Sequence, residues 1–190
     1  MLSEKLTKAS IAVAENDDQT AFQELFRHFF PGMLSFAASY MKNRMMAEEV
    51  VEDVFVKLWE NRKMLPAIRN LNYYLYVATK HAALNALKKD KSQDVIAPID
   101  DLEEETLRFN RTPEDVMISE QTLKEIEAIV NSLPGRCRLI FRLVKEEGLR
   151  YREVAELLNI SEKTVENQMT IAIRKLTART VHLISLRNAR

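Results

Sequence analysis

Glycine, proline and cysteine are scarce in this chain of 190 residues, which contains three, five and one of them, respectively. Long stretches free of glycine and proline favour helices over a turn-rich β fold. Cys137 alone cannot form an intramolecular disulfide, so a reducing compartment is the simplest setting. The chain has no run of about 18 apolar residues, and residues 1–18 lack the basic and apolar segments of a signal peptide. We therefore expect a cytoplasmic protein without a membrane span.

Catalytic signatures are missing as well. The three histidines, His28, His81 and His182, are far apart in the sequence. No metal-ligand spacing, glycine-rich phosphate loop or nucleophile motif accompanies them. Carboxylates are plentiful, but they occur at the spacing of helix surfaces. The sequence thus predicts a protein that is not an enzyme and that has no cofactor, no metal site and no small-molecule substrate.

Helical periodicity is concentrated in two blocks, from about residue 20 to residue 89 and from about residue 113 to residue 187. Between them lie residues 90–112, with seven acidic residues, three basic residues and no clean period. The pattern predicts an all-α protein of two small helical domains, residues 1–89 and 113–190, joined by an acidic linker. An ordered irregular loop within one domain is the alternative for the middle stretch.

The charges balance overall, with 28 basic and 28 acidic residues, but they do not balance locally. Residues 62–89 contain six basic residues and no acidic one, and residues 136–190 contain twelve basic and six acidic residues. Two separated basic surfaces could contact phosphates at two places on one duplex. Ordinary solvated faces are the alternative. An acid-free window of 28 residues in a chain that is 29% charged favours nucleic-acid contact.

The first block predicts two helical segments before its basic window. Residues 20–41 have apolar residues at helical spacing, which Pro31 and Gly32 are expected to interrupt. Residues 47–62 form an amphipathic helix whose other faces carry five carboxylates and one lysine, as a protein-binding surface would. Trp59, the only tryptophan, is expected to pack between helices. The predicted core residues of this second helix are Val51, Val54, Phe55 and Leu58.

Residues 71–89 combine aromatic rings with positive charge. Rings that stack on unpaired bases and lysines that hold phosphates are what melted DNA requires. By composition alone this signal is weak, because tyrosines on helices are more often half-buried structural residues. The predicted inner face is Leu75, Ala78, Ala82 and Leu87. The rings and charges are supplied by Tyr73, Tyr74, Tyr76, Lys80, His81, Lys88 and Lys89.

The second block predicts helices over residues 122–132 and 136–147, followed by a helix-turn-helix over residues 151–176. Asn159 occupies the tight turn, where a left-handed residue is needed and Asn is the most tolerant after Gly. Ser161 is a natural N-cap for the following helix. The buried stripe of that helix is predicted to be Val165, Met169, Ala172, Ile173 and Leu176. Its opposite face presents groups suited to base edges and phosphates in a major groove: Lys163, Glu166, Asn167, Thr170 and Arg174.

In order and spacing, these motifs resemble the sigma-70 family, and specifically its extracytoplasmic-function (ECF) group. The segment AEEVVEDVFVKLWENR is similar to the helix that docks on the clamp helices of the polymerase β′ subunit. The segment LNYYLYVATKHAALNALKK resembles the regions that melt and read the −10 promoter element. The segments LPGRCRLIFRL, GLRYREVAELLNIS and EKTVENQMTIAIRKL resemble the domain that reads the −35 element.

The resemblance implies a sigma factor that binds RNA polymerase core, through the β′ clamp helices and the β flap, and directs initiation at promoter DNA. It also implies an anti-sigma factor as a partner, commonly anchored in a membrane. The implied polymerase-binding residues are Glu49, Val50, Glu52, Asp53, Lys57 and Trp59. The residues implied to contact the −10 element are Arg62, Lys63, Arg69, Asn70, Asn72, Tyr73, Tyr76, Lys80, His81, Lys88 and Lys89. Those implied to contact the −35 element are Arg150, Tyr151, Ser161, Lys163, Thr164, Glu166, Asn167, Thr170 and Arg174.

Two other functions stay open at this point. A stand-alone helix-turn-helix regulator would not need core polymerase and would usually bind a palindrome as a dimer. The aromatic and basic residues 73–89 and the acidic helix over residues 47–60 argue against it. A degenerate sigma factor that only sequesters its partners would not need the basic window that residues 62–89 retain.

Overall fold

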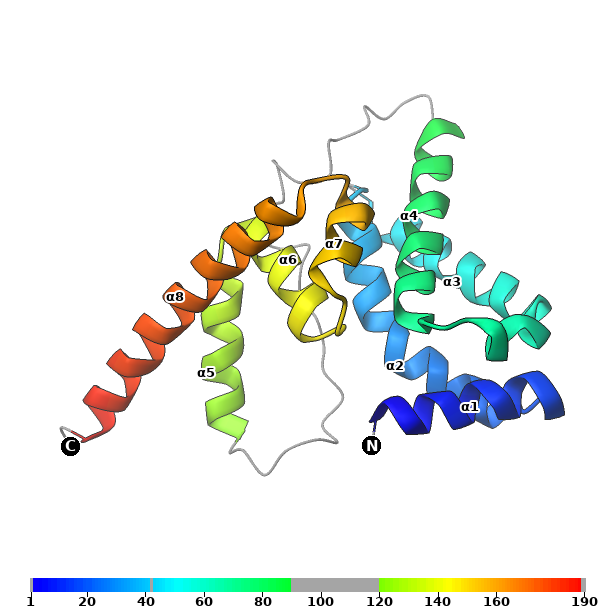
Figure 1. The fold of residues 1–190 in the computed structure, drawn as a ribbon, viewed down its shortest axis with the longest axis horizontal. Helices are drawn as coiled ribbons and strands as arrows, with labels where there is room; N and C mark the ends of the chain where they lie inside the picture. The colour runs from blue at the N-terminus through cyan, green and yellow to red at the C-terminus, as the bar shows by residue number, and fades with distance from the viewer. Residues whose placement is uncertain (1, 42, 90–119, 189–190) are drawn as a thin grey trace. The chain divides into compact units, whose positions relative to one another are not determined.

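The computed structural model of the protein describes residues 2–41, 43–89 and 120–188. All regular elements in these ranges are helices, which confirms the predicted all-α fold (Figure 1). The chain divides into two compact units, one built on the helices before residue 90 and one on the helices after residue 119. The predicted linker, residues 90–112, lies outside the described residues, and the predicted domain limits stay predictions.

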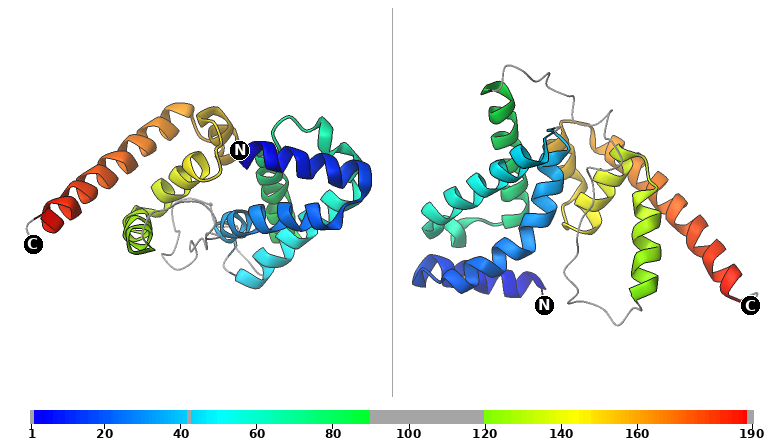
Figure 2. Two further views of the ribbon diagram at one scale, coloured as in Figure 1. Left: turned by 90° about the horizontal axis from the view of Figure 1, so that it is seen from below. Right: turned by 180° about the vertical axis from the view of Figure 1, so that it is seen from behind.

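The first unit is a helical bundle centred on α2. Leu25, Phe29, Met33 and Phe36 are buried along one side of this helix, at the spacing of successive turns. α2 packs against α1, α3 and α4, and α3 also packs against α4 (Figure 2). The elements are α1 (Leu2–Asn16), α2 (Gln19–Ala38), α3 (Arg44–Glu60), the 3-10 helix η1 (Arg62–Ala67) and α4 (Leu71–Lys89).

The helix α1 is not predicted by the sequence pattern. Its buried residues are small or polar, with Ala9, Ser10 and Val13 facing inward, so the apolar period is weak. The helix ends before Asp17, whose φ of 53° lies in the left-handed region. Asp18 then caps α2, because its Oδ1 accepts hydrogen bonds from the backbone N–H groups of Thr20 at 2.8 Å and Ala21 at 3.0 Å.

The predicted interruption at Pro31 and Gly32 is wrong. α2 continues through both residues as far as Ala38. Proline removes one backbone hydrogen bond and crowds the preceding turn, which disfavours a helix interior. Here every residue from Gly32 to Met41 is buried. Packing of these buried turns against the rest of the bundle outweighs the cost of the proline, because tertiary packing supplies most of the stability of helices in proteins.

The inner faces of α3 and α4 differ in how well the sequence predicts them. All four predicted core residues of α3 are buried: Val51, Val54, Phe55 and Leu58. On α4 the predicted face is partly wrong, because Ala78 and Ala82 are only half-buried. The buried residues of α4 are Leu75, Tyr76, Thr79, Ala83 and Leu87. Four of these residues are spaced four apart, and Tyr76 is the fifth. Thr79, a polar residue, therefore takes the inward position that the prediction gave to Ala78. The Thr79 hydroxyl donates to the Leu75 carbonyl at 2.8 Å, which makes its burial tolerable.

The second unit consists of α5 (Glu120–Asn131), α6 (Gly135–Lys145), α7 (Tyr151–Leu158) and α8 (Glu162–Asn188). α8 packs against the other three helices of the unit, and Figure 2 shows it continuing beyond α6 and α7. Val165, Met169 and Ala172 of α8 are buried as predicted. Ile173 is 47% exposed, which contradicts its predicted place in the buried stripe. The stripe of α8 advances three or four residues at each step, so the position directly after Ala172 turns outward.

Two arginines that count toward the basic window of residues 136–190 are buried. Arg138 and Arg142, on α6, are 1% and 2% exposed. Both bind the C-terminal residue of α5: the Arg138 Nη1 donates to the Asn131 carbonyl at 2.5 Å, and the Arg142 Nη2 donates to Asn131 Oδ1 at 2.8 Å. Cations at a helix C-terminus satisfy its last carbonyls. These two charges therefore stabilise the unit and do not belong to its surface.

Candidate nucleic-acid interface

The outer face of α3 is acidic. Glu49, Glu52 and Asp53 are exposed, and none of them forms an ion pair with another residue of the described ranges. Lys57 is exposed on the same helix. Unpaired carboxylates on a helix leave a negative surface that complements a basic protein partner.

Two of the residues predicted to bind polymerase, Val50 and Trp59, are less exposed than the carboxylates of α3. Val50 is 6% exposed and belongs to the core of the bundle, so it presents little surface to a partner, and its role as a contact residue stays a prediction. Trp59 is half-buried, with its ring 5.0 Å from the Phe22 ring in an edge-on arrangement. The expectation that Trp59 packs between helices is therefore confirmed.

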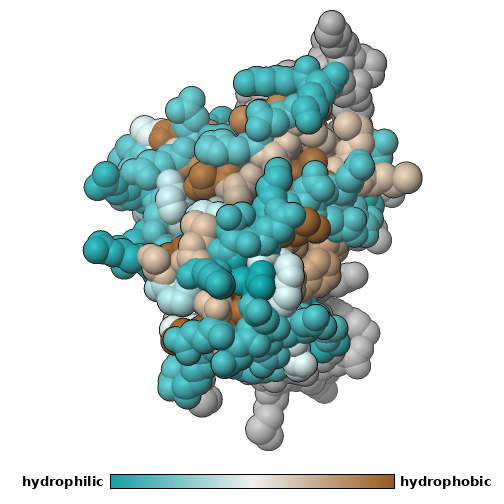
Figure 3. Space-filling model, turned by 90° about the vertical axis from the view of Figure 1, so that its right-hand side faces the viewer, coloured by the Kyte–Doolittle hydropathy of each residue, from teal (hydrophilic) through white to brown (hydrophobic). Residues whose placement is uncertain are grey.

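The sequence pattern also missed an apolar residue on α3. Val56 is 56% exposed and lies among the carboxylates of the outer face. Val56 could be recognised in the sequence as an apolar residue that falls outside the helical period of the buried residues. The face of the molecule drawn in Figure 3 is likewise mainly hydrophilic, with smaller apolar patches. The outer face of α3 thus combines charged residues with one exposed apolar side chain.

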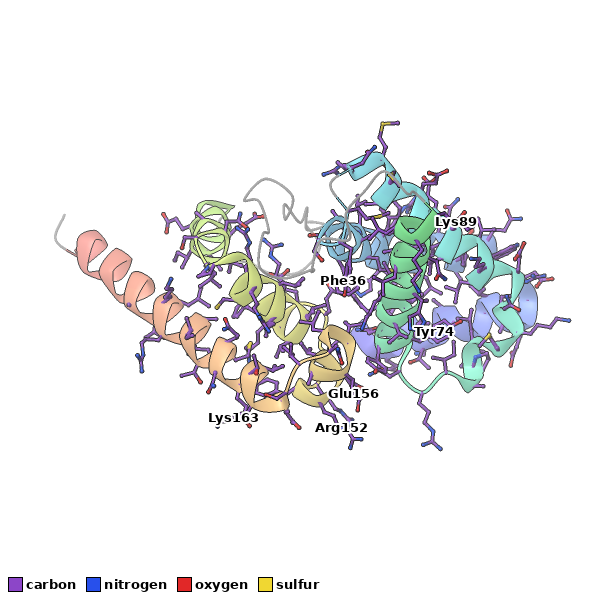
Figure 4. The ribbon with its side chains drawn as sticks, turned by 90° about the horizontal axis from the view of Figure 1, so that it is seen from above. Phe36, Tyr74, Lys89, Arg152, Glu156 and Lys163 are labelled. Atoms are coloured by element: carbon purple, nitrogen blue, oxygen red, sulfur yellow. The ribbon has the colours of Figure 1, made fainter. Side chains whose placement is uncertain are left out.

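The acid-free stretch of the first unit presents its positive charge to solvent. The exposed members are Lys63 and Arg69, around η1, and His81, Lys88 and Lys89 along α4. Figure 4 labels Tyr74 near the start of α4 and Lys89 at its end, and the exposed basic residues of the helix lie in its second half, from His81 to Lys89. Asn72, Tyr73 and Lys80 are half-buried, and burial lowers the pKa of Lys80 from its ordinary value.

Three residues predicted to contact the −10 element make contacts within the first unit. Tyr76 is fully buried, and its ring packs edge-on against Phe36 with centroids 5.2 Å apart, so it cannot stack on a base. Asn70 caps α4, because its Oδ1 accepts from the Tyr73 backbone N–H at 3.2 Å. Arg62 binds Asp17 and covers Trp59. The family resemblance implied these residues by their positions in the sequence, which do not record what a side chain contacts in the fold.

The helix-turn-helix of the second unit has the predicted local geometry. Asn159 adopts the left-handed conformation, with φ 54° and ψ 49°. The Ser161 Oγ accepts from the Thr164 backbone N–H at 3.0 Å, which confirms the predicted N-cap of α8. The Arg150 backbone N–H donates to Glu153 Oε2 at 2.8 Å and so helps to close the start of α7. Backbone and cap together fix the angle between α7 and α8.

The outward face of α8 carries the predicted polar groups. Lys163, Asn167, Thr170 and Arg174 are exposed. Glu166 is half-buried and pairs with Lys163 at 2.7 Å, and Lys163 is labelled in Figure 4. Of the remaining predicted residues, Arg150 and Ser161 are exposed, whereas Tyr151 and Thr164 are half-buried. An exposed face with amide, hydroxyl and guanidinium groups near a helix N-terminus matches the chemistry of a recognition helix.

The left-handed conformation of Asn159 predicts that substitutions at this position change the stability of the second unit. We expect Asn159→Val to destabilise the second unit by about 1–2 kcal/mol, because a β-branched residue is strained at positive φ. Asn159→Gly should unfold at or slightly above the wild-type midpoint. Urea unfolding followed by circular dichroism measures the shift, and fluorescence of Trp59 reports the first unit as an internal control. An unchanged transition for Asn159→Val would contradict the role of the turn.

Within the part of the chain that the structure describes, no group of His, Cys, Asp and Glu residues could hold a metal ion. Cys137 is buried, with its Sγ 3.3 Å from the Gln168 carbonyl oxygen. None of the helices in the described ranges is both long and apolar enough to cross a membrane.

Two family models match this chain. Residues 25–93 match sigma-70 region 2, and residues 123–176 match sigma-70, region 4. The ECF RNA polymerase sigma factor RpoE of Cereibacter sphaeroides is 22% identical over 170 residues, covering 87% of this chain and 89% of that protein. The ECF RNA polymerase sigma-E factor of Escherichia coli is 23% identical over 175 residues, covering 88% and 91%. Among solved structures, CnrH in complex with the cytosolic domain of CnrY matches 94% of this chain and 98% of its own, with 18% identity and a TM-score of 0.45.

The matched regions together make up more than half of the chain, in the order that the two units have. The chain therefore belongs to the sigma-70 family of transcription initiation factors, which are not enzymes. Within that family it is an ECF sigma factor, which directs transcription initiation with RNA polymerase.

Proposed function

We propose that this sigma factor selects promoters by reading a −10 element with the first unit and a −35 element with α8 of the second unit. The observation that carries this proposal is the helix-turn-helix, in which a capped helix presents exposed Lys163, Asn167 and Arg174. The acid-free surface of η1 and α4 supports the −10 part. Core polymerase would hold both units on one duplex, so that two modest affinities combine through effective concentration.

A second part of the proposal concerns how the polymerase is bound. The acidic outer face of α3, with Glu49, Glu52 and Asp53 exposed, would dock on the β′ clamp helices, and the second unit would contact the β flap. The protein would act in the cytoplasm, where the polymerase works. An anti-sigma factor, commonly membrane-anchored in this family, would hold it inactive until a signal releases it.

Reconstituted run-off transcription tests the proposal. The full-length protein is mixed with sigma-free core polymerase and a library of genomic promoters, and the transcripts are sequenced. We expect a small set of start sites that share two sequence elements at −10 and −35. Duplex binding by the protein alone, with no transcripts in the presence of core, would instead establish a stand-alone regulator.

Salt dependence provides a further prediction. We expect the free protein to bind promoter duplex weakly, with an affinity that falls steeply as salt increases, because phosphate contacts release counterions. Lys88→Ala combined with Lys89→Ala should reduce the slope of log affinity against log salt by about 2, since each phosphate contact contributes about 0.9. Fluorescence anisotropy with a labelled duplex measures both quantities. Lys8→Ala, on α1 and outside the acid-free stretch, is the control. Tight binding that ignores salt would contradict the prediction.

A further inference from the structure

The junction between α1 and α2 is tied to η1 by an ion pair. The Asp17 Oδ1 accepts a hydrogen bond from the Arg62 Nε–H, across 45 positions of sequence. Asp17 is the first of the two residues between the helices, and it has the left-handed conformation. Aspartate tolerates this conformation better than most side chains do, so the junction can place a carboxylate there at little conformational cost.

Arg62 makes two further contacts from the same guanidinium. Its Nη1 donates to the Trp59 carbonyl at 3.0 Å, and its Cζ lies 4.8 Å from the centroid of the Trp59 ring. The ring in turn meets Phe22 at the start of α2. A guanidinium can stack on a ring and donate in its own plane at the same time, which an ammonium cannot do. Arg62 thus joins α1, α2 and the end of α3 at the point where η1 begins.

The segment that follows is held on one side and exposed on the other. η1 packs against α1, and Leu65 is buried at its centre. Lys63 and Arg69 are exposed, and Met64 is 42% exposed. The segment ends at Asn70, which caps α4. Residues 61–70 are therefore a short strap that carries two exposed cations between two fixed ends.

Electrostatics favours the charged form of the pair. The hydrogen bond from Arg62 lowers the pKa of Asp17, and the same bond raises the pKa of Arg62. The pair is largely solvent-exposed on the aspartate side, so its contribution to global stability is small. A contact that adds little to stability yet fixes one end of an exposed basic segment is suited to local positioning.

We infer that Asp17 is a positioning residue for residues 61–70, holding them through Arg62 in the arrangement that opens promoter DNA at the −10 element. The inference rests on the proposed promoter function and adds to it a residue outside the predicted DNA-binding set. Asp17 touches no DNA in this scheme. It acts by setting where the cations of the strap lie.

The test compares Asp17→Asn with Glu15→Gln, which makes the same charge change on an exposed residue of α1. Each full-length protein is assembled with core polymerase on a promoter from the run-off library that carries 2-aminopurine in the −10 element. We expect Asp17→Asn to slow opening about 5- to 20-fold, an effect equivalent to 1–2 kcal/mol, while core affinity stays within about twofold of wild type. Glu15→Gln should open at the wild-type rate.

Arg62→Lys supplies the second arm, because lysine keeps the charge but loses the planar contacts. We expect it to slow opening as much as Asp17→Asn does, and the double variant to be no slower than either single variant. Emission of Trp59, the only tryptophan, should shift alike in all three. Wild-type opening rates for Asp17→Asn, additive defects, or an equal fall in core affinity would overturn the inference. A wild-type protein that opens no promoter with core would overturn the proposed function instead.

Discussion

Asp53→Arg should abolish promoter-specific transcription by this sigma factor with core polymerase, lowering run-off product by about 100-fold or more. Asp53 is exposed on α3, beside Glu49 and Glu52, which pair with no cation in the described ranges. If a basic surface of the polymerase meets this face, the substitution replaces an attraction with a repulsion. Like charges brought together at an interface cost several kcal/mol, and each 1.4 kcal/mol is tenfold in affinity.

The measurement is quantitative run-off transcription with a titration of sigma factor, paired with direct binding of labelled protein to core. Glu127→Arg is the matched control, because Glu127 is an exposed carboxylate of α5 outside every predicted binding set. The control should transcribe at the wild-type level, and both variants should keep the wild-type circular dichroism spectrum. Wild-type core affinity for Asp53→Arg would show that the acidic face of α3 serves some other purpose.

The helix-turn-helix illustrates what the sequence predicts well. Its turn, its cap and most of its buried stripe depend on contacts within a few residues, so the types of residue at Asn159, Ser161 and Val165 determine them locally. The prediction that Ile173 is buried is wrong within the same motif, because the sequence near an apolar residue beside the stripe does not show whether another helix covers it. Local chemistry determines the turn, whereas neighbouring helices determine the width of the buried face.

Long-range packing accounts for the other errors. α1 buries small residues whose period is weak, and α2 passes through Pro31 because the turns after it are enclosed by the bundle. The ring of Tyr76 suggests a base contact from the sequence, but the ring is buried in the core, where it packs against Phe36, forty positions earlier. None of these outcomes is encoded within one helix.

The candidate site shows the same division. The exposed carboxylates of α3 and the exposed polar groups of α8 follow from helical period alone. A count of charges, however, cannot distinguish Lys88, which is exposed, from Arg62, which is held by Asp17, or Arg142, which is buried against Asn131. Basic windows therefore predict where a nucleic-acid surface lies better than they predict which cations compose it.

Asn167→Ala should relax the choice of base at one position of the −35 element, with a loss of discrimination of about 5- to 150-fold, or 1–3 kcal/mol. Asn167 is exposed in the second turn of α8, where a recognition helix approaches base edges. A side-chain amide both donates and accepts, so it can bind the paired donor and acceptor of adenine, and alanine can do neither. The remaining positions of the −35 element and the −10 element should keep their preferences, because their contacts come from other side chains.

A promoter library randomised across the −35 element, transcribed by the reconstituted holoenzyme, measures the preference at each position. Thr177→Ala is the control, since Thr177 is an exposed residue of the same helix about three turns further on. A uniform fall in transcription from all sequences would assign Asn167 to the phosphate backbone, because phosphate contacts add affinity without reading bases. Loss of preference at a single base pair would instead fix the register of α8 in the major groove, and with it the direction in which the second unit lies along the promoter.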